Sequence, residues 1–256
     1  MNFIFPMGGL SKRFTDAGYT VPKFMLDLHG STVFEHAVIG FQRYFAEHNF
    51  VFAFRDDPAV ETFVREKCQR LGIPAENLHI VKLSAPTSGQ AETVWLALKA
   101  AGLRAADPII IFNIDSFQSD YQLPKALDLE TTAGYLEVFQ GEGEHWSFVL
   151  PGPDASATRV TEKDRVSDLC STGLYYFQHA ADFNAAFEQT LNMDVANLQG
   201  GERYVAPLYN TLISANKPVK YHLVPASEVT FCGTPDEYET LRRAAPPPTS
   251  AALAVL

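Results

Sequence analysis

Apolar residues in the first 112 positions form short runs separated by segments with helical periodicity. The runs have the length of buried strands and lie at Phe3–Phe5, Phe50–Phe54, Leu78–Val81 and Pro108–Phe112. The helical segments between them are Ser31–Val38, Ala59–Leu71 and Ser88–Ala101. We expect Ser31 to cap the first helix, and Gly72 and Gly102 to end the other two. Continuous apolar strands that alternate with helices predict an α/β fold with a mostly parallel, Rossmann-like central sheet and helices on both faces.

The second half of the chain has a different pattern, in which strands follow one another with few helices between them. The predicted strands are Ala133–Gln140, Trp146–Leu150, Thr158–Glu162, Gly173–Phe177 and Val219–Val224, and the predicted helices are Ala180–Leu191 and Tyr204–Ser214. Closely spaced strands predict a smaller antiparallel or mixed portion added to the parallel core. No Pro/Gly-rich linker divides residues 1–243, so we expect them to form a single domain.

Residues 244–256 break the pattern and form a tail rich in proline and alanine. Three consecutive prolines, Pro246–Pro248, exclude a helix in this segment. We expect the tail to be disordered, with an arm packed on the domain as the alternative.

Composition and charge restrict the range of functions. The chain has 256 residues, of which 46% are hydrophobic and 20% charged, as in a globular protein. Its net charge of −10 argues against a general nucleic-acid surface. The three cysteines lie at no metal or redox spacing, and we expect buried thiols in a reducing compartment. The sequence shows no signal peptide and no apolar run of about 20 residues, so we expect a cytoplasmic protein without a membrane span.

The turn after the first strand contains the strongest candidate for a ligand site. Gly8, Gly9 and Leu10 follow the strand, and Arg13 and Lys23 come soon after them. Glycines let backbone N–H groups approach an anion, and the two cations can neutralise it, so the segment is typical of a phosphate site. A tight turn followed by a solvated basic patch is the alternative.

Two further segments lie beyond the carboxyl ends of predicted parallel strands, where such sheets bind ligands. Asp115 follows the strand Pro108–Phe112, and a carboxylate that faces phosphates there is a typical magnesium ligand. A turn cap is an equally good interpretation of Asp115. The loop before the third helix consists of Thr87, Ser88, Gly89 and Gln90. Its hydroxyl, N–H and amide groups suit the edge of a nucleobase, with simple N-capping as the alternative.

Glu162, Lys163 and Gly173 lie near the junction of two predicted strands. Lys163 could meet a second phosphate and Glu162 a sugar hydroxyl, but an exposed, ion-rich hairpin explains the same residues. Later in the chain, Thr234 and Pro235 predict the start of a helix, with Thr234 as its N-cap. The seven histidines form no cluster at metal spacing, and no serine has the glycine-flanked setting of a hydrolase nucleophile.

In this order, the segments resemble the nucleotidyltransferases that activate sugar 1-phosphates, whose fold is also called glycosyltransferase-A-like. The resemblance spans residue 2 to about residue 240. Its motifs are Gly8, Gly9, Arg13, Pro22 and Lys23, then Thr87–Ala91, Asn113–Asp115, Glu162–Lys163, Ser171–Phe177 and Gly233–Pro235. The Pro-Met-Gly-Gly opening and Ala17-Gly18-Tyr19 are similar to a subgroup associated with capsule and surface-polysaccharide synthesis.

The resemblance implies a Mg²⁺-dependent reaction that converts a nucleoside triphosphate and a sugar 1-phosphate, or a similar phosphorylated acceptor, into a nucleotide sugar and pyrophosphate. It implies catalytic roles for Arg13, Lys23, Asp115 and Lys163, with Asp115 as the metal ligand. The nucleotide-binding residues would be Gly8, Gly9, Leu10, Thr87, Ser88, Gly89, Gln90 and Asp115. The acceptor-binding residues, in the antiparallel portion, would be Glu162, Lys163 and Gly173.

Two positions depart from the family pattern. Ser11 replaces a glycine of the phosphate loop, and Phe231 stands where many relatives have a second metal-binding aspartate. We therefore expect Asp115 to be the only protein carboxylate on the metal, with triphosphate oxygens and water as the other ligands.

Two other functions fit the same residues. One is a glycosyltransferase that consumes a nucleotide sugar, although Asn113-Ile114-Asp115 lacks the Asp-x-Asp usual in those enzymes. The other is a protein that binds a nucleotide or nucleotide sugar without turning it over. The base, the acceptor and the oligomeric state, a homo-oligomer included, stay open at this point.

Overall fold

A computed structural model of the chain describes residues 1–254. Its strands are β1 (Asn2–Met7), β2 (Asp27–Leu28), β3 (Ser31–Thr32), β4 (Asn49–Arg55), β5 (Leu78–Leu83), β6 (Ile109–Phe112), β7 (Ser116–Gln118), β8 (Gly134–Gln140), β9 (Ser147–Pro151), β10 (Ala157–Glu162), β11 (Leu169–Phe177), β12 (Val219–Leu223) and β13 (Val229–Phe231). Its α-helices are α1 (Lys12–Asp16), α2 (Val33–Ile39), α3 (Pro58–Leu71), α4 (Gln90–Ala100), α5 (Ala180–Thr190), α6 (Tyr209–Ser214), α7 (Pro235–Arg243) and α8 (Thr249–Leu253).

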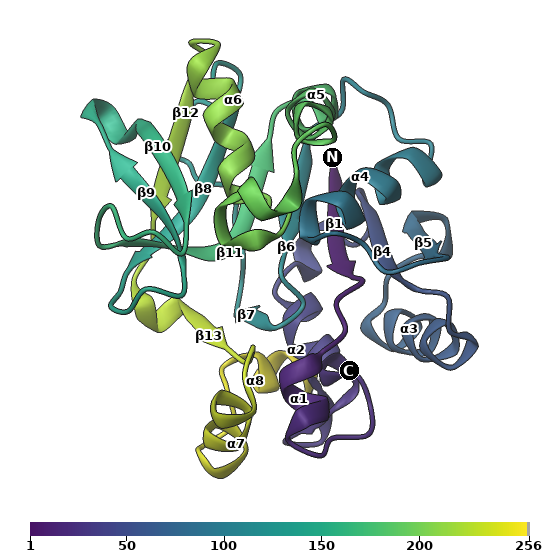
Figure 1. Ribbon diagram of the computed structural model, residues 1–256. Helices are drawn as coiled ribbons and strands as arrows, with labels where there is room; N and C mark the ends of the chain where they lie inside the picture. Colours follow the sequence, from purple (N-terminus) through teal and green to yellow (C-terminus); the bar gives the residue numbers. More distant parts are fainter. Residues whose placement is uncertain (255–256) are drawn as a thin grey trace.

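The main sheet has nine strands and mixed direction. Strands β6, β1, β4 and β5 run parallel in that spatial order, and β11 pairs antiparallel with β6 (Figure 1). Beyond β11, β9 and β10 form an antiparallel ribbon, while β8 pairs with β11 and has β12 parallel to it. Strands β2–β3 and β7–β13 form two small antiparallel sheets. The predicted α/β fold, with an antiparallel portion added to a parallel core, is confirmed.

Side-chain alternation along β1 divides the core into two layers, because successive residues of a strand face opposite sides of the sheet. Phe3 and Phe5 pack in one layer with the buried residues of α2 and α3, whereas Ile4 packs in the other with those of α4 and α5. Phe3 also stacks on Phe50, with ring centroids 4.9 Å apart. Helices thus cover both faces of the parallel sheet, which explains the long apolar runs in β1, β4 and β6.

The start of α2 differs from the prediction by one residue. Thr32, not Ser31, is the N-cap: its hydroxyl accepts a hydrogen bond from the Glu35 backbone N–H, and the Glu35 carboxylate accepts one from the Thr32 backbone N–H. Ser31 pairs with Leu28 in the β2–β3 hairpin, so its backbone belongs to a strand. The sequence pattern did not reveal this two-residue strand.

Helix α4 also starts later than predicted, at Gln90 instead of Ser88. Gly89, which precedes it, has φ of +148°, a value that ends any regular helix on its N-terminal side. The predicted start of α7 is confirmed, since Thr234 caps the helix and Pro235 is its first residue.

The expectation of a disordered, non-helical tail is wrong for residues 244–254. Pro247 is buried, and α8 begins directly after Pro248, where the fixed φ of proline suits a helix start. Leu253 is buried in the core layer of α2. In Figure 1, α7 and α8 lie near α1 and α2, at the lower end of the view. Residues 244–254 therefore form an arm that packs on the domain, which was the alternative interpretation. Residues 255–256 lie outside the residues that the structure describes.

The three cysteines, Cys68, Cys170 and Cys232, are buried free thiols, as predicted. Within residues 1–254, no helix has the length and apolar character needed to cross a membrane.

Candidate active site

A pocket of about 810 Å³ lies at the loops that follow β1, β5 and β6, beyond the carboxyl ends of these parallel strands. The predicted site residues in its wall are Gly8, Gly9, Leu10, Arg13, Lys23, Thr87, Ser88, Gly89, Gln90, Asp115, Glu162 and Gly173. Lys163 is the predicted site residue that does not belong to the wall. The sequence motifs thus come together in one cavity, as expected for ligand contacts collected at one edge of a sheet.

The glycine loop that follows β1 has no space for a side chain at its first residue, Gly8. A Cβ atom on Gly8 would lie 2.9 Å from both the Leu83 side chain and the Thr93 hydroxyl, so a larger residue would displace the loop. Ser11 has φ of +49°, in the left-handed region that glycine prefers. The serine therefore occupies the conformation that a glycine would allow, and its hydroxyl accepts a hydrogen bond from the Lys23 backbone N–H at 3.5 Å. Although Ser11 replaces the family glycine, the loop keeps the backbone conformation that glycine would adopt.

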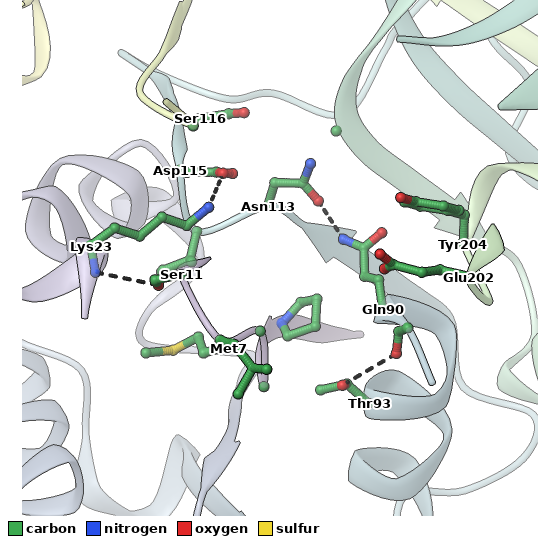
Figure 2. A pocket seen from close by; sticks show the side chains of 18 of the residues that line it. Met7, Ser11, Lys23, Gln90, Thr93, Asn113, Asp115, Ser116, Glu202 and Tyr204 are labelled. Carbon is green, nitrogen blue, oxygen red and sulfur yellow. Dashed lines mark hydrogen bonds and ion pairs between the residues drawn. The ribbon is translucent and has the colours of Figure 1, made fainter. Parts of the chain in front are cut away.

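Asp115 and Lys23 form an ion pair inside the pocket (Figure 2). Both side chains are mostly buried, with about a fifth of each exposed. The backbone of Asp115 accepts a hydrogen bond from the Cys232 N–H at 2.8 Å, which places the Gly233-Thr234 turn beside it. A Cβ on Gly233 would lie 3.0 Å from the Asp115 carboxylate, so glycine here keeps the space next to the carboxylate open.

This arrangement fits a magnesium ion held by one protein carboxylate. The open space at Gly233 gives access to Asp115, and magnesium commonly takes one or two carboxylates together with phosphate oxygens and water. Within the described residues, no group of three or more His, Cys, Asp or Glu side chains is placed to hold a metal. A bound metal would therefore depend on substrate oxygens for most of its ligands.

The predicted nucleobase loop is fixed by a segment that the sequence did not reveal. Arg203 pairs with the backbone on both sides of Gly89: its N–H donates to Ser88 at 2.9 Å, and its carbonyl accepts from Ala91 at 2.8 Å. A Cβ on Gly89 would lie 2.5 Å from the Arg203 carbonyl oxygen, so only glycine permits this approach. Gln90 donates its side-chain amide to Asn113, which joins the loop to the end of β6 (Figure 2).

On the opposite side of the pocket, Glu162 is buried at the end of β10. The Ser147 hydroxyl donates to its carboxylate, and burial raises the pKa of Glu162 above its ordinary value. Gly173 on β11 has φ of +89°, and a Cβ there would lie 2.5 Å from the Asn113 amide. Glycine at this position lets β11 approach the segment Asn113–Asp115 closely.

Lys163 has a different environment from the one predicted. Its ammonium donates to the Tyr204 hydroxyl at 2.7 Å and lies 4.8 Å from the centre of the Tyr204 ring. Tyr204 lines the pocket, whereas Lys163 does not. A direct contact between Lys163 and the acceptor would require this pair to open.

The segment 199–204, which we call the bridging loop, contacts both sides of the pocket. Arg203 holds the nucleobase loop, the Gln199 side chain accepts from the Glu162 backbone N–H at 3.1 Å, and Tyr204 binds Lys163. Figure 2 shows Glu202 and Tyr204 beside Gln90. The pair Gly200-Gly201 was the feature of the sequence that could have indicated this loop, and both glycines have positive φ in the structure.

Phe231, the second departure from the family pattern, is an aromatic part of the wall. It pairs with Ser116 across β13–β7 and packs on Trp146, with ring centroids 4.7 Å apart. Both rings line the pocket. An apolar surface therefore occupies the position where many relatives have a second metal-binding aspartate.

Comparison with solved structures identifies close relatives of this architecture. A nucleoside-diphosphate-sugar pyrophosphorylase from Vibrio cholerae RC9 is 42% identical, with a TM-score of 0.88 over 94% of this chain and 100% of that one. The inositol-1-phosphate CTP transferase from T. maritima, at 14% identity, shares the fold with a TM-score of 0.69 over 94% of both chains. No protein-family model and no curated protein matches the chain. The identity to the Vibrio protein over its whole length shows that this chain belongs to the nucleoside-diphosphate-sugar pyrophosphorylases, a family of sugar-phosphate nucleotidyltransferases, and is an enzyme of that class.

Proposed function

We propose that the enzyme couples a nucleoside triphosphate to a sugar 1-phosphate and releases pyrophosphate. The observation that carries the proposal is one pocket with cations and glycines on one side and a carboxylate–glycine pair on the other. Arg13 and Lys23 belong to the segment after β1, whereas Glu162 and Gly173 belong to β10 and β11 on the other part of the sheet. Two substrates with different chemistry can thus meet between the two sides.

In the proposed reaction, an oxygen of the acceptor phosphate attacks the α-phosphorus of the triphosphate. The new bond joins that oxygen to the α-phosphorus, and the bond from the α-phosphorus to the bridging oxygen breaks, so pyrophosphate leaves with the electron pair. The attacking oxygen is already anionic, and no general base is needed. Arg13 would hold the leaving pyrophosphate, and Lys23 would neutralise charge around the α-phosphate.

Asp115 is the residue that we propose to hold Mg²⁺, for which the open space at Gly233 leaves room. When bound, the ion supplies positive charge that neutralises the triphosphate oxygens. Lys23 is paired with Asp115 in the protein alone, and a nucleotide would offer its ammonium a phosphate partner instead. Glu162 would accept hydrogen bonds from sugar hydroxyls, and Thr87–Gln90 would bind the base.

The roles of the two cations are tested by Arg13→Ala and Lys23→Ala. We expect each variant to fold normally and to release pyrophosphate more slowly by about 100-fold or more, since preorganised charge in such sites contributes several kcal/mol. Arg159→Ala, at an exposed ion pair outside the pocket, is the matched control. Near-wild-type pyrophosphate release by either pocket variant would show that its assigned role is wrong.

The substrates are identified by measuring pyrophosphate release from each nucleoside triphosphate with a panel of phosphorylated acceptors. Release that depends on a sugar 1-phosphate supports the proposal. Release of free nucleoside diphosphate from a nucleotide sugar would instead indicate a glycosyltransferase. We propose that the reaction takes place in the cytoplasm and that its product supplies capsular or surface polysaccharide synthesis, as in the subgroup that the opening motif resembles.

A further inference from the structure

Three aromatic side chains form a continuous surface at one end of the pocket. Trp146 lies 5.2 Å from Phe139 and 4.7 Å from Phe231, and Phe139 lies 5.1 Å from Phe231, between ring centroids. Trp146 and Phe231 line the cavity, whereas Phe139 is buried behind them. The indole N–H of Trp146 donates to the Glu142 carbonyl at 2.9 Å, which fixes the ring. We call Trp146 and Phe231 the aromatic wall.

The two rings of the aromatic wall come from segments next to the proposed metal carboxylate and the proposed acceptor carboxylate. Phe231 pairs with Ser116, the residue after Asp115. Trp146 precedes Ser147, whose hydroxyl binds Glu162. Asp115, Glu162 and the two rings line the same pocket, so a molecule that reaches from Asp115 to Glu162 can contact the rings.

The positively charged side chains of the pocket wall are concentrated in one segment of the chain. The lysine and arginine side chains of the described wall, Lys12, Arg13 and Lys23, all come from the segment after β1. Near the bridging loop, the wall contains the carboxylates Glu162 and Glu202, and the His145 ring lies 4.4 Å from that of Trp146. The cationic side suits the triphosphate, and the aromatic, acidic side suits a group that is neither anionic nor fully polar.

On the basis of the proposed function, we infer that the aromatic wall binds the sugar ring of the acceptor by its C–H face and selects neutral hexose 1-phosphates over hexuronic acid 1-phosphates. A pyranose has an apolar face for Trp146 and Phe231 and hydroxyl groups at its edge for Glu162. A carboxylate on the sugar would instead lie near the carboxylate of Glu202, where like charges repel. Phe231 thus serves acceptor binding at a position where many relatives have a metal-binding aspartate.

A fixed cation, such as the ammonium of a phosphorylated amino alcohol, is the other kind of group that binds aromatic rings near carboxylates. The sugar is favoured because Glu162 is buried, already accepts from Ser147, and has a raised pKa. These properties weaken it as a counterion but leave it able to exchange hydrogen bonds with hydroxyl groups.

The chain has two tryptophans, which allows a binding measurement that does not depend on turnover. Trp95 lies on α4, outside the pocket wall, and Trp95→Phe leaves Trp146 as the single reporter of tryptophan fluorescence. We expect glucose 1-phosphate to change this fluorescence in the presence of a nucleoside triphosphate, and glucuronic acid 1-phosphate to bind at least tenfold more weakly. Equal affinity for the two sugars, tighter binding of phosphocholine, or no fluorescence change with any hexose 1-phosphate would overturn the inference.

Steady-state kinetics test the wall residues themselves. Trp146→Leu and Phe231→Leu should raise the KM for the sugar 1-phosphate about tenfold while the KM for the nucleotide stays within twofold. Trp146→Phe and Phe231→Tyr, which retain a ring, should restore most of the acceptor affinity. An unchanged acceptor KM in the leucine variants, or an equal rise in both KM values, contradicts the inference.

The two proposals can fail separately. If hexose 1-phosphates change the Trp146 fluorescence but no pyrophosphate is released, the proposed reaction is wrong and the sugar-binding role of the wall is supported. If pyrophosphate is released while the leucine variants keep the wild-type acceptor KM, the reaction is supported and the role of the wall is wrong.

Discussion

A carboxyl group is buried in the sheet at Glu137, next to the active-site strand β11. Its Oε1 atom accepts hydrogen bonds from Gln118 and, at 2.9 Å, from Thr172. Thr172 lies where the β8–β11 pairing shifts register, and it also lines the pocket. Burial raises the pKa of Glu137 from 4.5 to about 7. Ionisation of this side chain near neutral pH therefore opposes folding.

The direction of the Glu137 pKa shift predicts how the stability of Glu137→Gln depends on pH. Because the pKa is higher in the folded than in the unfolded protein, stabilisation by Glu137 is complete below about pH 4.5 and is lost as pH rises through 7. Glutamine keeps an oxygen for Gln118 and Thr172 but cannot ionise. Between pH 5 and pH 8, we expect the Tm of Glu137→Gln to fall by about 5 °C less than the Tm of the wild type.

Thermal unfolding at several pH values measures this difference. Glu76→Gln, at an exposed position, is the control and should follow the wild-type curve. Parallel Tm curves for the wild type and Glu137→Gln would mean that Glu137 does not titrate in this range.

At the scale of single elements, Arg203 attaches the bridging loop to the nucleobase loop and to the end of α5. The guanidinium donates to the Ser88 hydroxyl at 2.8 Å and to the Thr190 and Met193 carbonyls at 3.1 Å. Arg203→Met should keep the backbone pairing at Gly89 but lose these side-chain bonds. Hydrogen bonds to a charged group are worth about 1.5–3 kcal/mol, so we expect nucleotide affinity to fall by about tenfold or more.

Calorimetric titration with the preferred nucleoside triphosphate checks this prediction, with Arg159→Met as a control on the surface. Because the bridging loop also contacts Glu162 and Lys163, the acceptor KM should rise in the same variant. Wild-type nucleotide affinity in Arg203→Met would show that the side chain does not position the loop.

The sequence predicted the elements with strong periodicity and missed those defined by distant partners. Strands β1, β4 and β6 were evident because both of their faces are buried, and the motif residues follow the ends of β1, β5 and β6. The bridging loop has no such pattern, since Arg203 acts on Ser88, 115 positions away. The orientation of Lys163 depends likewise on Tyr204, which lies in a part of the chain without a motif.

At the scale of the whole molecule, the arm formed by residues 244–254 connects the end of the chain to its first half. The Thr249 hydroxyl lies 2.7 Å from His36 Nδ1, and His36 Nε2 lies 2.9 Å from the Leu28 carbonyl. A carbonyl can only accept, so Nε2 carries the hydrogen and Nδ1 of the neutral ring accepts from Thr249. Burial lowers the pKa of His36, which favours this neutral form.

Deletion of residues 244–256 should therefore destabilise the enzyme without removing any part of its active site. The deletion exposes the apolar contacts of Leu253 and Pro247 and leaves buried His36 without its donor, a loss of about 2–4 kcal/mol. We expect Tm to fall by about 5–10 °C, since 1 kcal/mol corresponds to about 2–4 °C in a protein of this size. No residue between 244 and 254 lines the pocket, so kcat and both KM values measured well below the transition should match the wild type. Thr249→Val, which removes only the hydroxyl, should give a smaller fall in Tm. Loss of activity in the truncated enzyme at a temperature where it remains folded would show that the arm acts on the site itself.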